Sequence, residues 1–255
     1  MNFGGSRLGF WWRWPPGLPD RRLSTNRVLV FYDPYTNVSG NTDYYNTGGD
    51  VNPLTGIWPV IQAREIALGF QPELIVGYNN LPTNLIQQYA HLWDIGYASP
   101  YTTNPTFNPT TLLSTYIQEG GAMFMLGENA YFQVRDTTIE TFVASLGGGN
   151  ALSNTPGVPT VVTQTVEPEF RVANQSSTIT WGAPAGFDSY GTATPITTGG
   201  GISPTAVMWK TGSLSNAPKG AIVSVLDINF FGAEPFPQYY DPDFIDNLSI
   251  TMNKL

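Results

Sequence analysis

The chain has 255 residues, a formal net charge of −8 and only 12% charged residues, whereas glycine (27) and proline (21) are plentiful and aromatic residues reach 13%. The negative charge argues against a nucleic-acid partner, because neutralising phosphates requires clustered lysine and arginine. The absence of cysteine excludes disulfides, a thiolate nucleophile and a cysteine-ligated metal ion.

We expect residues 1–26, which are both aromatic and basic, to form an irregular N-terminal arm. Its prolines break any helix, it lacks the apolar stretch of a signal peptide, and no window of the chain predicts a membrane span, so we expect a soluble protein with no membrane partner. Such an arm either folds back over its own domain or inserts into a neighbouring subunit, where tryptophan and arginine are common anchors. The candidate anchors are Phe10, Trp11, Trp12, Arg13, Trp14, Arg21 and Arg22.

From Arg27 onward, buried strands alternate with amphipathic helices. The run RVLVFYD is continuously apolar and ends in an acid, which is typical of a strand buried on both faces. Repeated βα units predict an α/β fold, a mostly parallel sheet with helices on both faces. The predicted strands are 27–33, 72–78, 91–98 and 121–127, and the predicted helices are 59–69, 109–119 and 135–149.

Residues 150–218 interrupt this alternation with short β-type runs between proline, glycine and asparagine turns. A buried strand at 219–231 and a helix at 241–255 then resume the earlier pattern. We therefore expect one α/β domain over residues 27–255 with a β-rich insertion at about 150–218, rather than two domains in tandem.

The order VLVFYD, LIVGY, LWDIGYA, YIQEGGAMFMLGEN and KGAIVSVLDINFF resembles the class I glutamine-amidotransferase-like (flavodoxin-like) fold, in its trehalose-utilisation-like and β-galactosidase-appended branches. The resemblance covers most of 27–255 except the insertion. It implies a cysteine nucleophile at the sharp turn after the strand, but this chain has Gly127-Glu128-Asn129 there. The family's histidine base lies in a late loop, whereas His91 begins a predicted strand. We therefore expect no amidotransferase activity and a structural role for His91.

Four acids, Asp33, Asp94, Glu128 and Asp227, fall at or near the C-terminal ends of predicted parallel strands, the edge where ligands bind in open α/β sheets. They could hold a divalent cation or form a carboxylate pair for glycoside hydrolysis. Alternatively, they accept backbone amides and cap the next helix. We favour the last interpretation and expect no metal ion or cofactor, although sequence spacing leaves open whether the four acids converge.

Two classes of function remain. The favoured class is a non-enzymatic structural or interaction protein, a virion component such as a tail, baseplate, fibre or capsid accessory subunit, which binds other subunits through residues 1–26. The alternative is a cytoplasmic carbohydrate-active protein, either a carboxylate-dependent hydrolase or a binding module. Its stacking platforms would be tyrosines of loop 32–58 and segment 97–107, such as Tyr32, Tyr97 and Tyr101.

Overall fold

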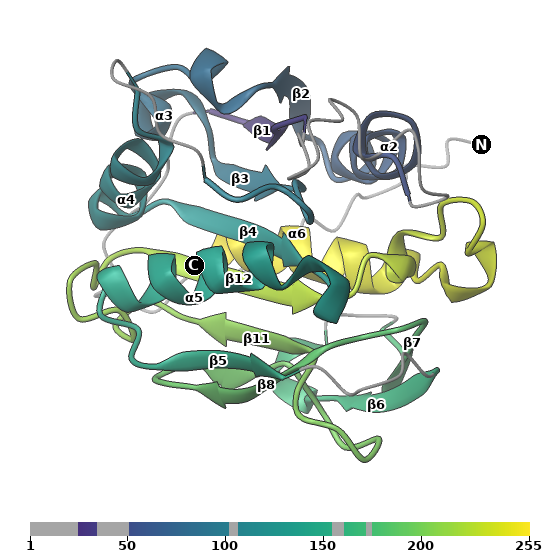
Figure 1. Ribbon diagram of the computed structural model, residues 1–255. Helices are drawn as coiled ribbons and strands as arrows, with labels where there is room; N and C mark the ends of the chain where they lie inside the picture. The colour runs from purple at the N-terminus through teal and green to yellow at the C-terminus, as the bar shows by residue number, and fades with distance from the viewer. Residues whose placement is uncertain (1–24, 35–50, 102–106, 155–160, 172–174) are drawn as a thin grey trace, which may run out of the picture.

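The computed structural model describes residues 25–34, 51–101, 107–154, 161–171 and 175–255 (Figure 1). The candidate anchors of the arm, from Phe10 to Arg22, lie outside the described residues. The strand after the arm begins at Arg27, but Thr25 and Asn26 already belong to the fold: the Thr25 hydroxyl donates to the Gln88 carbonyl (2.9 Å), and the Asn26 carbonyl accepts from the Gln71 amide (2.8 Å).

A seven-stranded sheet with the order β2-β1-β3-β4-β12-β11-β9 organises the molecule (Figure 1). Its first five strands run parallel to one another, and β11 and β9 add antiparallel pairings at one end. The predicted α/β fold with a mostly parallel sheet is therefore confirmed. The strands are β1 (Arg27–Tyr32), β2 (Gln71–Val76), β3 (His91–Asp94), β4 (Ala122–Gly127), β9 (Thr194–Pro195), β11 (Ala206–Trp209) and β12 (Ala221–Leu226).

Helices cover both faces of the sheet, and the strands alternate their side chains between two cores. Val28 and Val30 of β1 point into the core that also contains residues of α2 and α6, whereas Leu29 and Phe31 point into the core shared with α3, α4 and α5. This alternation explains why the central strands read as continuous apolar runs. The helices are α2 (Trp58–Ala67), α3 (Leu85–Gln88), α4 (Pro109–Glu119), α5 (Gln133–Ser145) and α6 (Pro242–Lys254).

Local signals fix the ends of the longer helices. The Asn108 side chain accepts from the Thr111 amide (3.2 Å) ahead of Pro109, and α4 ends at Gly120, whose φ of 111° is left-handed. The Asp241 side chain caps α6 by accepting from the Phe244 amide (2.9 Å). Short helical turns complete the chain: η1 (Pro53–Ile57), η2 (Tyr78–Asn80), η3 (Ala130–Phe132), η4 (Pro168–Phe170), η5 (Asn229–Phe231) and η6 (Pro237–Tyr239).

The segment 150–218 is rich in short strands, and it also extends the main sheet, because β9 and β11 come from it. Its remaining strands form a three-stranded sheet with the order β10-β6-β7 and a two-stranded sheet of β5 and β8 (Figure 1). These strands are β5 (Ala151–Asn154), β6 (Val162–Val166), β7 (Thr178–Trp181), β8 (Gly186–Tyr190) and β10 (Thr197–Thr198).

One buried amide, Gln164 of β6, ties these strands together. Its side-chain oxygen accepts hydrogen bonds from Trp181 Nε1 (3.0 Å), Thr197 Oγ1 (2.7 Å) and the Thr205 amide (3.2 Å), and Gln164 is only 1% exposed. The Trp181 ring in turn packs edge-on against Phe244 of α6, with 5.5 Å between ring centroids. Gln164 therefore couples the β6–β7 sheet to the core beneath α6.

Replacing Gln164 with leucine should lower the free energy of unfolding by at least about 3 kcal/mol, because three buried donors lose their acceptor and each unsatisfied group costs about 1–3 kcal/mol. Denaturant unfolding measures the change. The matched control is Thr163→Val on the same strand, since Thr163 is exposed and its change should stay below about 1 kcal/mol. A Gln164→Leu protein as stable as the control would contradict this role.

Candidate functional site

The four predicted acids lie along one edge of the sheet. Asp94 is the last residue of β3, and the other three follow directly after β1, β4 and β12, which are neighbours in the order β1-β3-β4-β12. The structure brings the acids together in two pairs whose charges interact: Asp33 with Asp94, and Glu128 with Asp227. What each carboxylate can do depends on its partners.

Asp94 forms a buried ion pair. Its Oδ2 lies 2.8 Å from Nη2 of Arg135, and both side chains are 0% exposed. The Tyr101 hydroxyl donates to the same oxygen (2.7 Å), and Arg135 Nε donates to the Leu126 carbonyl of β4 (2.8 Å). Arg135 therefore neutralises Asp94 and joins α5 to the ends of two strands.

Glu128 is 2% exposed, and both of its carboxylate oxygens accept hydrogen bonds. Oε2 accepts from the Ile228 amide (2.7 Å), and Oε1 accepts from the side-chain amide of Asn129 (2.7 Å). Burial, reinforced by the negative charge of Asp227, raises the pKa of Glu128 well above its usual value. Glu128 thus connects the turn after β4 to the turn after β12.

Asp227 has a similar loop-fixing position. Its Oδ2 accepts from the amides of Gly182 (2.8 Å) and Ala183 (3.3 Å), and Oδ1 accepts from the Asn229 amide (2.6 Å). The side chain is 0% exposed, and burial raises its pKa to about 6. Asp227 therefore holds a turn of the 150–218 segment against the end of β12.

Asp33 is the most accessible of the four acids. It is partly exposed, and its Oδ1 accepts a hydrogen bond from the Tyr78 amide (3.2 Å). Partial burial raises its pKa above the usual value, and the charge of Asp94 acts in the same direction.

Two further charged residues of this site, Arg135 and Asp136, come from the first turn of α5 and were not predicted. Asp136 is 2% exposed, its Oδ1 accepts from the Glu128 amide (3.2 Å), and burial raises its pKa to about 8. The signal for Arg135 was present in the sequence: it lies four residues before Ile139 and seven before Phe142, on the buried stripe of the helix.

This arrangement suits carboxylates that fix loops. Glu128 and Asp227 face backbone amides and are nearly or fully excluded from solvent, whereas a glycoside hydrolase needs a carboxylate pair that reaches the scissile bond. Within the described ranges, no group of three or more histidine, aspartate and glutamate side chains is placed to hold a metal ion.

His91 lies at the start of β3, the opposite end of the strand from Asp94, and is 0% exposed. Its Nε2 lies 2.9 Å from Glu65 Oε1, and that oxygen also accepts from Trp93 Nε1 (2.7 Å) and Ser249 Oγ (2.5 Å). Serine and carboxylate both approach Nε2, whereas a nucleophile relay would place them on opposite ring nitrogens. His91 is therefore part of a buried polar contact between α2, α6 and β3.

The tyrosines expected to form sugar-stacking platforms include two that are buried. Tyr32 is 6% exposed, and Tyr97 is 0% exposed with its hydroxyl donating to the Val51 carbonyl (2.9 Å). That part of the expectation was wrong, because both rings belong to the core below α2. The most exposed aromatic among the described residues is Tyr131 at 79%, three residues after Glu128.

No family model and no curated protein matches this chain. Solved structures match its fold: a cytoplasmic protein of Salmonella typhimurium (13% identity, TM-score 0.60) covers 89% of this chain and 98% of its own. A ThuA-like protein from Bacteroides uniformis (13%, TM-score 0.56) covers 94% and 95%. An exo-β-1,4-mannosidase from Opitutaceae bacterium strain TAV5 (11%, TM-score 0.52) covers 88% of this chain, which spans only 35% of the enzyme.

These likenesses show the fold alone, an α/β fold that this chain shares with the ThuA-like protein, and in that respect they agree with the resemblance. The described part of the chain contains no helix of the length and apolarity that a bilayer crossing requires.

The buried acids predict that stability falls as the pH rises. Asp136 and Asp227 have folded-state pKa values of about 8 and about 6, above the usual 3.8 that applies in the unfolded chain. Between about pH 4 and pH 8 the folded state therefore binds more protons, so the free energy of unfolding decreases with pH. The melting temperature should be higher at pH 5 than at pH 9.

Asp136→Asn should flatten this decrease by at least about 1 kcal/mol, or about 2–4 °C in melting temperature, because asparagine still accepts the Glu128 amide but carries no charge. The matched control is Glu119→Gln at the exposed end of α4, which should leave the pH profile unchanged. Stability that stays constant or rises from pH 5 to pH 9 would disprove the buried-acid interpretation.

Proposed function

We propose that this chain is a non-enzymatic structural or interaction subunit of a larger assembly. One observation carries the proposal: at the sheet edge where this fold class binds ligands, Asp94, Glu128 and Asp227 are buried and bonded to the protein's own groups. In the part of the edge that the structure describes, these carboxylates therefore stabilise the domain and form no exposed pair for chemistry.

The assembly that we propose is a virion, with this chain as a tail, baseplate, fibre or capsid accessory subunit. The support comes from composition: few charges, many glycine, proline and aromatic residues, and an aromatic, basic arm ahead of a compact domain. In this proposal, residues 1–24 attach the domain to neighbouring subunits. Burying one aromatic side chain contributes about 1.5–3 kcal/mol, so Trp11, Trp12 and Trp14 together would supply several kcal/mol of attachment.

Deleting residues 1–24 should leave the melting temperature of the domain nearly unchanged while abolishing incorporation into the parent assembly. The truncation stops before Thr25, because Thr25 and Asn26 are hydrogen-bonded to the domain. Calorimetry measures stability, and co-expression with the assembly followed by particle purification measures incorporation.

A second variant separates the aromatic side chains from the length of the arm. The full chain with Trp11, Trp12 and Trp14 replaced by alanine should also fail to incorporate, whereas replacing Asn2 and Ser6 by alanine should have no effect. A truncated chain that melts far lower would show that the arm belongs to its own core and would remove the basis of the proposal.

The alternative, a carboxylate-dependent glycoside hydrolase, predicts that the protein turns over a glycoside, whereas our proposal predicts no turnover. We expect no turnover of glutamine, nitrophenyl acetate or nitrophenyl glycosides above a heat-treated control, because Asp94, Glu128 and Asp227 at the sheet edge are buried and cannot reach a substrate. Activity that disappears in Glu128→Gln, which preserves the side-chain shape, would reverse this assignment.

A further inference from the structure

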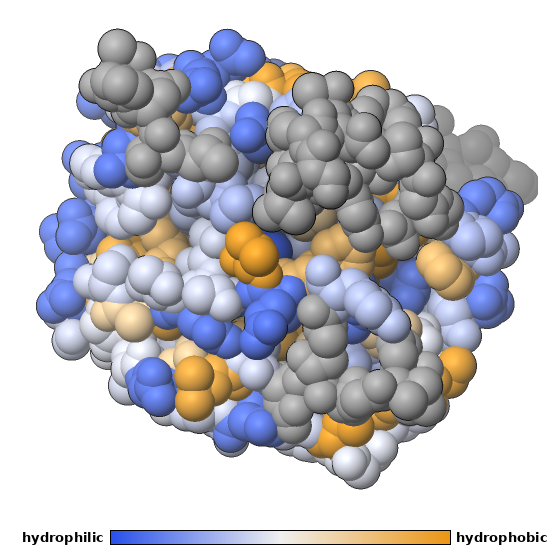
Figure 2. Space-filling view, in the orientation of Figure 1, coloured by the Kyte–Doolittle hydropathy of each residue, from blue (hydrophilic) through white to orange (hydrophobic). Residues whose placement is uncertain are grey.

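The loop between β12 and α6 presents aromatic rings and carboxylates to solvent. Tyr240 is 46% exposed, and Phe236 and Tyr239 are partly exposed, with 6.5 Å between their ring centroids. In Figure 1 this loop (yellow) projects beyond the arrowhead of β12, and Figure 2 shows mainly hydrophilic residues at that side of the molecule. Residues 234–243, which we call the loop surface, are separate from the buried acids of the sheet edge.

Two acids of the loop surface are available to a cation. Glu234 is exposed and Asp243 is partly exposed, and neither side chain forms an ion pair or a hydrogen bond with another described residue. The hydrogen bond from Arg64 to Asp246 raises the pKa of Arg64, and Asp243 and Tyr240 act in the same direction. Asp243 and Tyr240 therefore lie near each other, so an incoming arginine finds both a carboxylate and a ring face.

The sequence of residues 14–22, WPPGLPDRR, has the chemistry that this surface selects. Pro16 and Pro19 have the spacing at which two prolines share one face of a polyproline II helix, and segments of this kind bind aromatic side chains. Arg21 and Arg22 follow and supply the charges that carboxylates attract. Charge is also complementary over longer stretches, because residues 1–24 contain four of the 11 cationic residues and only one of the 19 acids.

The arm and the loop surface belong to opposite edges of the sheet. The chain enters β1 from Thr25, whose hydroxyl donates to the Gln88 carbonyl just ahead of β3 (2.9 Å), so the arm ends at the edge where the parallel strands begin. The loop surface follows β12 and lies at the edge where the strands end. Copies joined from arm to loop therefore stack head to tail, and such a contact builds a ring or a filament.

The length of the arm allows this connection. Fully extended, residues 1–24 span up to about 80 Å, whereas the two edges of the sheet are separated by only about 20 Å, the length of a six-residue strand. The arm is therefore long enough to reach a second copy that presents its loop surface to the edge where the arm ends.

We propose that residues 14–22 of one copy bind the loop surface of a neighbouring copy, so that the chain assembles head to tail with itself. The prolines pack against the rings of Phe236, Tyr239 and Tyr240, and the arginines pair with Glu234 and Asp243. This inference rests on the proposed function, because it names a second copy of this chain as the partner of the arm.

Sedimentation velocity on the full chain tests this inference, because the natural chain should associate as its concentration rises. A loop variant, Glu234→Lys with Asp243→Lys, should raise the dissociation constant at least about tenfold, since attractions between opposite charges become repulsions. An arm variant, Arg21→Glu with Arg22→Glu, should have the same effect. The chain that combines all four changes should associate again, because the two sides have exchanged their charges and still attract each other.

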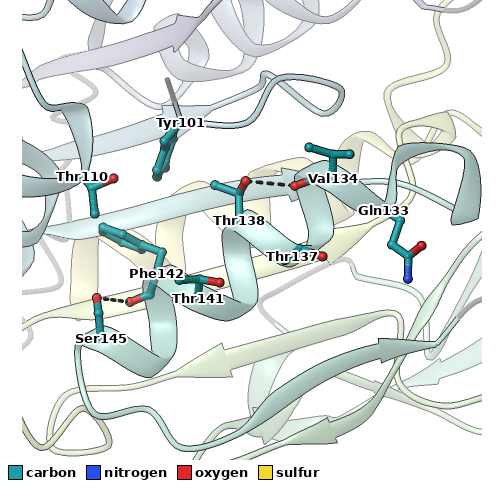
Figure 3. A pocket seen from close by; sticks show the side chains of 9 residues that line it. All are labelled: Tyr101, Thr110, Gln133, Val134, Thr137, Thr138, Thr141, Phe142 and Ser145. Carbon is teal, nitrogen blue, oxygen red and sulfur yellow. Dashed lines mark hydrogen bonds between the residues drawn. The ribbon is translucent and has the colours of Figure 1, made fainter. Parts of the chain in front are cut away.

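A second loop variant, Tyr240→Ala, removes an exposed ring without changing the charge at the start of α6, and it should also weaken association. The matched control is Glu119→Lys with Thr137→Lys and Thr141→Lys, which changes the net charge as much as the first loop variant does. These exposed positions lie at the end of α4 and on the outer face of α5, where Figure 3 shows both threonines. The control should associate like the natural chain.

All variants are first checked for an unchanged melting temperature. The inference is overturned if the natural chain stays monomeric up to millimolar concentration, if both loop variants associate like the natural chain, or if the fourfold exchange fails to restore association. Incorporation into the parent assembly separates this inference from the assembly role. If deletion of residues 1–24 abolishes incorporation while both loop variants incorporate normally, the assembly role stands and the loop surface is not the partner of the arm.

Discussion

The ion pair between Asp94 and Arg135 is the constraint around which the edge of the sheet is built. Both side chains are 0% exposed, and an isolated charge in such surroundings would cost several kcal/mol in lost hydration. Arg135 therefore needs Asp94 and also the Leu126 carbonyl, which ties α5 to both β3 and β4. The other buried acids of the edge also have polar partners, because Glu128 and Asp227 accept hydrogen bonds from backbone amides.

The parts of the fold that the sequence predicted well are those with local signals. The helix predicted at 109–119 has the same bounds in the structure, because Pro109 begins it and Gly120 ends it. Two strands were predicted too long, and in each of them an acid marks the point where the strand ends. The strand β3 ends at Asp94, whose Oδ1 accepts a hydrogen bond from the Gly96 amide (3.3 Å). The strand β12 ends just before Asp227, whose Oδ1 accepts a hydrogen bond from the Asn229 amide. Apolar residues continue beyond both points, so hydropathy alone placed the boundary too late.

The candidate site was predictable only in part, because the sequence contains local signals but does not reveal contacts between distant segments. An acid at the end of an apolar run can be placed at the sheet edge from sequence, as Glu128 and Asp227 were. Its partners cannot, because the Gly182 amide lies 45 positions away from Asp227, and the Ile228 amide lies 100 positions away from Glu128. These contacts depend on the tertiary arrangement, and so do the buried amide of Gln164 and the sharing of Glu65 by His91 and Ser249.

The two faces of α5 have different consequences for function. Its inner face contributes Arg135 and Asp136 to buried contacts, and replacing either group without a substitute leaves a buried partner unsatisfied. Its outer face contributes Thr137 and Thr141, whose hydroxyls stabilise nothing else among the described residues. The fold therefore needs the polar groups of the inner face, whereas the exposed threonines of the outer face can be replaced without the loss of a buried contact.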